Sequence, residues 1–203
     1  MFSFDDFLAR AQTRLLTEPP LGWNRSDDDM NERARMIPVG MKPNPAAVLI
    51  GIVERNEPMV ILTMRQSHLA KHPGQIAFPG GRLDAGESVL EGALREAREE
   101  IGLDQAFVKP IGYLDGFLTI TQYVVNPVVA LVSPRCVLAA HAGEVAEIFE
   151  VPLAFLMDGA NCQTHSREFN GLTRYFYVYP FGERYIWGAT AGMIRNLHER
   201  LYA

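Results

Sequence analysis

The chain has 203 residues, a length typical of one domain with at most a small appendage. Hydrophobic residues make up 48% and charged residues 21%, which indicates a globular protein with a full core and excludes a disordered chain. The net charge of -5 argues against a broad basic surface, so we expect no nucleic-acid partner.

Only two cysteines are present, Cys136 and Cys162, which excludes a disulfide framework and favours a reducing compartment. The first residues are acidic and lack the basic and apolar regions of a signal peptide, and no apolar stretch approaches the roughly 18 residues of a membrane span. We therefore expect a cytoplasmic protein with no membrane partner, with both cysteines filling the core. The sequence does not decide between a monomer and a homodimer.

The N-terminal part predicts a helix followed by an irregular segment. Residues 3–16 form an amphipathic pattern with Ser3 as a candidate cap, and Pro19 and Pro20 end it. Residues 21–45 are polar and rich in proline, which is typical of a strap across a domain surface. We therefore divide the chain into a helix and strap, residues 1–45, and a main domain, residues 46–203.

The main domain alternates strand and helix patterns. Apolar runs at 46–53 and 59–63, separated by a turn sequence, predict a strand pair, and a glycine loop follows at 78–81. A helix is expected over 88–101, with Gly102 as its left-handed C-cap. Further strands are predicted over 108–114, 123–132 and 174–179, and helices over 151–157 and 190–201. These elements predict an α/β fold with a mixed sheet.

Three glutamates, Glu96, Glu99 and Glu100, share one face of the predicted helix within a single turn. One interpretation is a solvated charged face, in which neighbouring arginines offset the repulsion. The loop before the helix favours a second interpretation, because Gly80 and Gly81 allow backbone groups to approach a ligand closely. Clustered carboxylates beside such a loop are typical of a site for Mg²⁺ or Mn²⁺ and a diphosphate.

Residues 81–103, GRLDAGESVLEGALREAREEIGL, resemble the Nudix box, G-x5-E-x7-R-E-U-x-E-E-x-G-U, in which U is a bulky aliphatic residue. The matching positions are Gly81, Glu87, Arg95, Glu96, Glu99, Glu100, Gly102 and Leu103. Ala97, smaller than the usual residue at the first U, departs from the pattern. The resemblance implies a Nudix fold, an α/β/α sandwich around a mixed sheet, and hydrolysis of a nucleoside diphosphate linked to another moiety.

The resemblance also implies roles for individual residues. Glu96, Glu99 and Glu100 match the metal-binding carboxylates, with Glu99 also assigned to catalysis, while Arg95 and Glu87 match the pair that braces the loop against the helix. Many Nudix enzymes recruit a further carboxylate from a later loop. Here Glu144 is the first candidate for a catalytic role and Glu147 the second, with a solvated surface acid as the alternative for each.

The segment before the box resembles the signature of coenzyme A pyrophosphatases in the Nudix family, L-L-T-x-R-[SA]-x3-R-x3-G-x3-F-P-G-G. The matching positions are Leu62, Thr63, Arg65, Gly74, Phe78, Pro79, Gly80 and Gly81. Gln66 and Ala70 depart from it, and Lys71 is a candidate replacement for the arginine absent at Ala70. The N-terminal helix and residues 185–194 are similar to those of bacterial members, and we expect Trp187 in the core, with base stacking as the alternative.

A dense cationic patch precedes the acidic helix and consists of Arg65, His68, Lys71 and His72. Coenzyme A carries a 3'-phosphate that such a patch could bind. We therefore assign Arg65, His68 and Lys71, together with the two loop glycines, to substrate binding, with local packing as the alternative for each side chain. The predicted reaction is metal-dependent cleavage of free or acylated coenzyme A to 3',5'-ADP and 4'-phosphopantetheine.

Two other functions stay open. One is hydrolysis of a different nucleoside diphosphate derivative, such as ADP-ribose or a dinucleotide. The other is a non-catalytic Nudix domain that senses a nucleotide, which the three retained carboxylates argue against.

Overall fold

The computed structural model describes residues 2–34, 36–68 and 73–203. Its main sheet runs in the order β1-β7-β8-β2-β3-β4, with β5 beside β2, β6 beside β8 and β9 beside β3. The strands are β1 (Arg25–Ser26), β2 (Asn44–Val53), β3 (Met59–Arg65), β4 (Ile76–Ala77), β5 (Gly80–Arg82), β6 (Val108–Tyr113), β7 (Phe117–Leu118), β8 (Tyr123–Val132) and β9 (Val145–Pro152). The sheet is mixed, because β2 runs parallel to β8 and antiparallel to β3 and β5.

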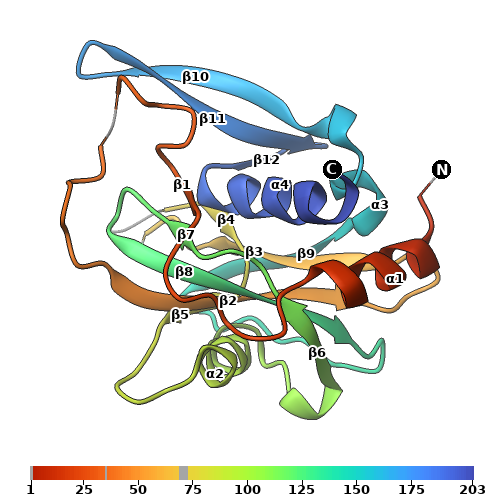
Figure 1. Cartoon of the computed structure of the whole chain (residues 1–203). Helices are drawn as coiled ribbons and strands as arrows, with labels where there is room; N and C mark the ends of the chain where they lie inside the picture. The colour runs from red at the N-terminus through yellow and green to blue at the C-terminus, as the bar shows by residue number, and fades with distance from the viewer. Residues whose placement is uncertain (1, 35, 69–72) are drawn as a thin grey trace.

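Helices cover both faces of this sheet. They are α1 (Phe4–Arg14), α2 (Val89–Ile101), α3 (Leu153–Leu156) and α4 (Ala189–Tyr202), with 3-10 turns η1 (Gln105–Phe107) and η2 (Gly159–Asn161). Figure 1 shows α2 below the sheet and α4 above it, with α1 at one side, where its Phe7 and Ala11 share the core cluster of α4. Successive side chains of β2 point to opposite faces, so Leu49 packs with the α2 cluster and Ile50 with the cluster that includes α4. This arrangement confirms the predicted α/β/α fold class.

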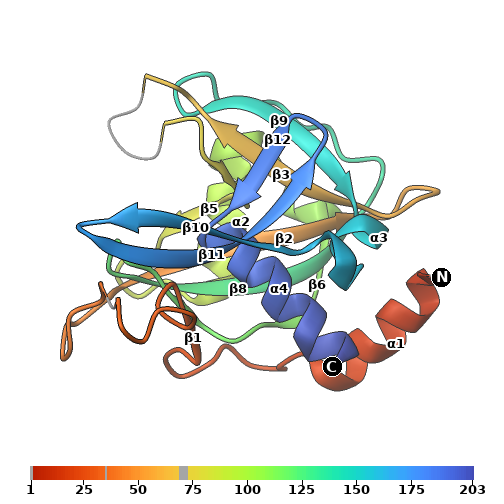
Figure 2. The same cartoon turned by 90° about the horizontal axis from the view of Figure 1, so that it is seen from above.

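A smaller antiparallel sheet lies over α4 and consists of β10 (Gln163–Phe169), β11 (Leu172–Phe181) and β12 (Arg184–Trp187). Figure 2 shows its strands crossing above the helix. Ile186 is fully buried on the face toward the core, whereas Trp187 points to the opposite face and is 38% exposed. The expectation of a core Trp187 is therefore wrong, and its indole instead meets the Phe176 ring edge-on at 5.4 Å.

The N-terminal helix packs on α4, and the segment after it reaches the small sheet. Ser3 caps α1 by accepting a hydrogen bond from the Asp6 backbone, and Phe7 is fully buried. We call residues 21–43 the strap. Its Asp28 forms an ion pair of 2.8 Å with Arg174 of β11, and the two side chains are only 9% and 12% exposed. The strap thus connects the main sheet, through β1, with the small sheet (Figure 1).

Two of the differences from the sequence prediction concern β9 and β10. Residues 151–157 were expected to be helical, but β9 extends to Pro152 and α3 covers only Leu153–Leu156. Pairing of β9 along the whole of β3 outweighs the local pattern. Strand β10 was not predicted, because its residues are mostly polar and exposed; it is held by its backbone pairing with β11.

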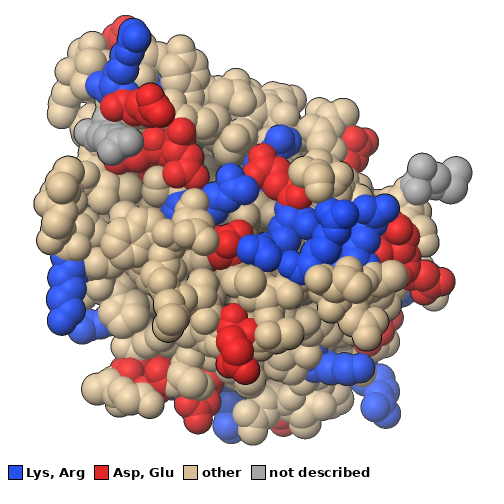
Figure 3. All heavy atoms as spheres, in the orientation of Figure 1, with Lys and Arg blue, Asp and Glu red and all other residues tan. Residues whose placement is uncertain are grey.

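The surface seen in Figure 3 carries both signs of charge, with basic side chains gathered over the region where α1 meets α4. There Arg14 donates to the Ala203 carbonyl and Arg200 donates to the Arg14 carbonyl, so arginines satisfy the ends of both helices. Cys136 and Cys162 are both free and partly buried against the core. Among the described residues, no helix has the length and apolar character needed to cross a bilayer.

Candidate active site

Helix α2 carries the predicted carboxylates and has well-defined ends. Ser88 and Glu91 form a capping box, in which the Ser88 hydroxyl accepts from the Glu91 backbone and the Glu91 carboxylate accepts from the Ser88 backbone. Gly102 adopts the left-handed conformation at the C-terminus, with φ 66°. The sequence prediction of this helix and its C-cap is confirmed.

The two loop glycines allow β5 to approach both the sheet and the helix. A Cβ at Gly80 would lie 2.4 Å from the Ala47 carbonyl oxygen, inside the pairing of β5 with β2. A Cβ at Gly81 would lie 2.5 Å from Oε1 of Glu96. The first glycine is therefore required by the sheet, and the second leaves room for the Glu96 carboxylate directly against the strand.

Glu100 is the most buried carboxylate of the site, with 6% exposure. Its Oε2 accepts a hydrogen bond of 3.1 Å from the Gly80 backbone, and its Oε1 lies 3.8 Å from Nη1 of Arg65, the last residue of β3. The pKa of Glu100 is raised to about 7, chiefly by burial; the charges of Glu96 and Glu144 contribute to this rise, while the Gly80 hydrogen bond and Arg65 oppose it. Burial likewise raises the pKa of Glu96.

Arg95 joins the box loop to the acidic face of the helix. Its Nε and Nη2 donate to the two oxygens of Glu87 at 2.8 and 3.0 Å, and its Nη1 donates to Glu96 and Glu99 at 3.0 and 3.1 Å. Glu87 also accepts from the Asp84 backbone at 2.9 Å. This geometry suits the bracing role that the family resemblance implied for Arg95 and Glu87.

The carboxylates of α2 are oxygen donors suited to a divalent cation. Glu96 lies against Gly81 and Glu100 against Gly80, whereas Glu99 is 59% exposed and accepts a hydrogen bond from Arg95. Within the part of the chain that the structure describes, no three His, Cys, Asp or Glu side chains already form a cluster that would hold a metal. Burial raises the pKa of both Glu96 and Glu100, and these two carboxylates are nevertheless hard oxygen donors whose charge a cation would stabilise, so the residues fit Mg²⁺ or Mn²⁺.

The two later acids lie in different surroundings. Glu144 is exposed in the loop before β9, and its charge reaches both Glu96 and Glu100, whose pKa values it helps to raise. Glu147 lies within β9 and forms an ion pair with Arg184 of β12, whose guanidinium stacks on a β9 phenylalanine ring. The structure therefore places Glu144 toward the acidic face and ties Glu147 to the small sheet.

The structure describes the positions of some of the expected substrate-binding residues. Arg65 reaches Glu100, and its Nε is buried with no hydrogen-bond partner among the described residues. His68 is exposed beyond the end of β3. Lys71, with Ala70 and His72, lies outside the described residues. The sequence analysis did not predict that Gln66 donates hydrogen bonds to the loop that carries Glu144. The only indication in the sequence was that Gln66 departs from the coenzyme A signature.

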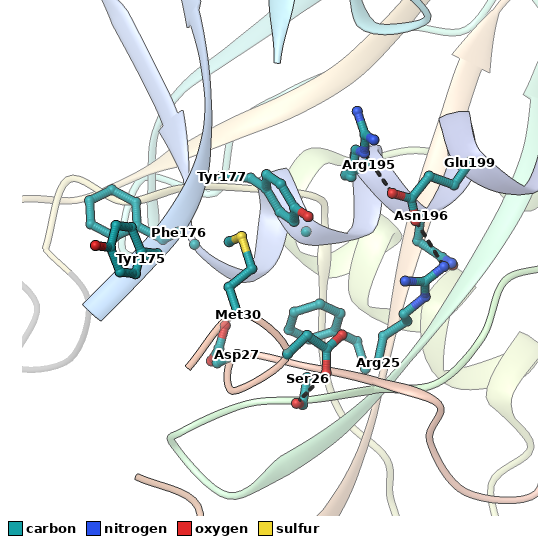
Figure 4. A pocket seen from close by; sticks show the side chains of 14 residues that line it. Arg25, Ser26, Asp27, Met30, Tyr175, Phe176, Tyr177, Arg195, Asn196 and Glu199 are labelled. Atoms are coloured by element: carbon teal, nitrogen blue, oxygen red, sulfur yellow. Dashed lines mark hydrogen bonds and ion pairs between the residues drawn. The ribbon is translucent and has the colours of Figure 1, made fainter. Parts of the chain in front are cut away.

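A cavity of about 60 Å³ lies away from α2, between the strap, β11 and α4 (Figure 4). Its two arginines, Arg25 and Arg195, both bind the carboxylate of Glu199, at 2.8 and 2.7 Å. None of the candidate residues that the structure describes lines it. We therefore assign the chemistry to the face formed by Gly80, Gly81 and α2.

Comparison with known sequences gives the family. The sequence model of the NUDIX domain matches residues 42–154, more than half of the chain, and this range contains all the candidate residues. The chain belongs to the Nudix family. It is accordingly a Nudix hydrolase, a pyrophosphohydrolase of nucleoside diphosphate derivatives.

Relatives match over nearly the whole chain. Proteins of Enterobacter sp. (strain 638) and Escherichia coli O7:K1, both named "Uncharacterized Nudix hydrolase NudL", are 36% and 37% identical over 196 residues, covering 96% of this chain and 93% of each relative. Among solved structures, a Deinococcus radiodurans protein is similar with a TM-score of 0.49 and 13% identity, over 82% of this chain and 88% of that one. A Caenorhabditis elegans Ap4A hydrolase in a binary complex has a TM-score of 0.47 and 17% identity, over 54% and 80%.

Proposed function

We propose that this Nudix hydrolase cleaves the diphosphate of coenzyme A, free or acylated, to 3',5'-ADP and 4'-phosphopantetheine, with Mg²⁺ or Mn²⁺. The observation that carries the proposal is the 3.8 Å approach of Arg65 to Glu100. Arg65 belongs to the coenzyme A signature segment and Glu100 to the Nudix box. The guanidinium of Arg65, from the coenzyme A signature, thus lies beside the carboxylate of Glu100, from the Nudix box. A diphosphate bound at the acidic face would contact both motifs.

The residues divide into binding and chemical roles. Glu96, Glu100 and Glu99 would hold the divalent cation, which when bound supplies neutralisation of the charge that develops on the diphosphate. The Gly80 N–H keeps the Glu100 carboxylate oriented, and Arg65 binds a phosphate oxygen. These groups hold the diphosphate against the acidic face without placing uncompensated negative charges together.

Glu144 is the proposed general base, because its charge acts on the acidic face from a different loop. It would take a proton from the attacking water as the water oxygen bonds to one phosphorus. The bond from that phosphorus to the bridging oxygen breaks, and the second phosphate leaves as a monoester. One oxygen of solvent water therefore enters one product.

We assign substrate specificity to the segment after β3. Because Arg65 lies beside Glu100, it is positioned to bind the diphosphate that is cleaved. The 3'-phosphate of coenzyme A would then be bound by His68 and Lys71. The Lys71→Ala variant should then narrow the preference for coenzyme A over dephospho-coenzyme A. Arg65→Ala should instead slow both substrates by a similar factor, roughly tenfold to a hundredfold for a charged hydrogen bond.

A substrate panel tests the proposal. Coenzyme A, acetyl-coenzyme A, dephospho-coenzyme A, ADP-ribose and a dinucleoside diphosphate are incubated with Mg²⁺ or Mn²⁺ in ¹⁸O-labelled water, and products are identified by mass. Coenzyme A should be cleaved faster than ADP-ribose, with one labelled oxygen in a phosphate. Faster cleavage of ADP-ribose would overturn the coenzyme A assignment, and nucleotide binding without turnover of any substrate would indicate a sensing domain.

Matched variants link the activity to the site. Glu100→Gln should lower turnover by several orders of magnitude while retaining the fold, and excess chelator should abolish wild-type activity. Glu57→Gln, which changes an exposed glutamate in the turn between β2 and β3, provides the control and should behave as wild type. Full activity in chelator would refute the metal-dependent reaction.

A further inference from the structure

We propose that Gln66 is a positioning residue that fixes the backbone of the loop carrying Glu144. Gln66 follows β3 directly, next to Arg65. Its backbone N–H donates to the Glu144 carbonyl at 2.9 Å, and its side-chain Nε2 donates to the carbonyls of Ala142 and Val145 at 3.1 and 3.3 Å. Three hydrogen bonds from one residue therefore hold the chain before, at and after Glu144.

The same loop is tied to the catalytic helix at its other end. The His141 N–H donates to the carbonyl of Glu100 at 2.9 Å, and the N–H groups of Glu144 and Val145 both donate to the His141 carbonyl, at 3.0 and 2.9 Å. The loop is thus suspended between α2 and Gln66. Because the His141 bond leads to the residue whose carboxylate faces Gly80, a shift of the loop would alter the separation of Glu144 from Glu100.

The carboxylate of Glu144 needs this support. It is exposed, and no hydrogen bond to its oxygens is found in the part of the chain that is described, so its position depends on the backbone beneath it. Proton transfer by a general base requires placement within hydrogen-bond distance of the water. A residue that limits motion of the loop backbone would therefore act on turnover more than on substrate binding.

The amide side chain of Gln66 allows it to hold the loop that carries Glu144. The coenzyme A signature has Ser or Ala at this position, and neither side chain carries an amide that could bridge two carbonyls three residues apart. The glutamine, a departure from the signature, supplies two N–H donors on a longer side chain. The departure thus adds a connection between the substrate-binding segment and the Glu144 loop.

A double-mutant cycle tests the proposal, which rests on the role proposed for Glu144. The variants are Gln66→Met, which keeps the side-chain length but removes the amide donor, Glu144→Gln, and the two combined. Gln12→Met, the same change on the exposed face of α1, is the control. The rates are measured on whichever of coenzyme A and ADP-ribose the wild type cleaves faster, so failure of the coenzyme A assignment does not affect the cycle.

Gln66→Met should lower kcat roughly threefold to tenfold, as expected for lost neutral hydrogen bonds, with KM unchanged. In the Glu144→Gln background the same substitution should change kcat by less than about twofold, because the group that it positions is already gone. An equal loss in both backgrounds, or a wild-type kcat for Gln66→Met, would overturn the positioning role while leaving Glu144 as the base. A wild-type kcat for Glu144→Gln would overturn the role of Glu144 and the inference with it.

A merely structural role is separated by thermal unfolding. If Gln66 only stabilised the fold, Gln66→Met would lower the melting temperature and leave kcat per folded molecule unchanged. The positioning role predicts the reverse, a small change in melting temperature with the stated loss of kcat.

Discussion

Replacing Gly81 by alanine tests whether the Glu96 carboxylate must lie against β5. The new Cβ would stand 2.5 Å from Oε1 of Glu96 and 2.6 Å from its Cδ, whereas ordinary contacts begin at 3.4 Å. The carboxylate must therefore retreat by about 1 Å, the difference between 3.4 and 2.5 Å, and it can do so because it is the end of a flexible side chain. Misplacement of a reacting group by about 1 Å can cost on the order of 10²-fold in rate.

The neighbouring glycine separates activity from stability. At Gly80 the clashing atoms are backbone, the Ala47 oxygen at 2.4 Å and the Val48 Cα at 2.6 Å, so Gly80→Ala must disturb the pairing of β5 with β2. Overpacking of this kind costs about 1 to 3 kcal/mol, or roughly 2 to 12 °C in melting temperature for a chain of this size. Gly81→Ala should lose much less stability and more activity.

The assay is a Mg²⁺ titration of turnover together with thermal unfolding of both variants. Gly159→Ala serves as the control, because its Cβ would meet only the edge of the His198 ring at 3.3 Å, away from the site. We expect Gly81→Ala to need more Mg²⁺ and to have a lower maximal rate. If Gly81→Ala kept wild-type turnover and Mg²⁺ dependence, the placement of Glu96 as a metal ligand would be refuted.

Three further predictions concern buried or bonded acids. The folded-state pKa of Glu100, about 7, exceeds its ordinary 4.5, so between these pH values the metal-free folded protein binds more protons than the unfolded chain. The free energy of unfolding should therefore fall by on the order of 3 kcal/mol as pH rises from about 4.5 to 7, and the melting temperature should fall with it. Glu100→Gln or added Mg²⁺ should remove this decline. Glu87→Gln weakens the contacts to Arg95 and should reduce thermal stability more than Mg²⁺ affinity, as a paired unfolding and metal titration would reveal. Asp28→Asn removes the charged partner of the nearly buried Arg174 and should lower the free energy of unfolding, measured with denaturant, by about 3 to 5 kcal/mol. Glu32→Gln changes an exposed residue of the same strap and should lower it little.

Elements with a strong local pattern were predictable from the sequence. The box helix was expected over 88–101 and runs Val89–Ile101, because Ser88 and Gly102 mark its ends chemically. The apolar runs at 46–53 and 59–63 became β2 and β3 with small extensions. Where the pattern was weak, partners elsewhere in the chain decided the structure: β9 is a strand because β3 lies beside it, and β10 because β11 does.

The site was predictable in its residues more than in its arrangement. The spacing of Glu96, Glu99 and Glu100 places them on one face, but it does not determine that Arg95 Nη1 donates to both Glu96 and Glu99 while Glu100 accepts from Gly80. The approach of Arg65 to Glu100 also depends on how β3 and α2 meet in the fold. Trp187 shows the same limit, because no local signal tells which face of a small sheet is covered.

The ion pair between the strap and β11 imposes an order on biosynthesis. Asp28 and Arg174 are 146 positions apart, so at about 5 to 20 residues per second the ribosome needs on the order of 10 s to deliver the second after the first. Asp28 of the strap therefore cannot pair with Arg174 until nearly the whole chain has been synthesised. Native closure between the two ends of the sequence is accordingly a late event, completed only after the catalytic helix and its sheet have had time to form.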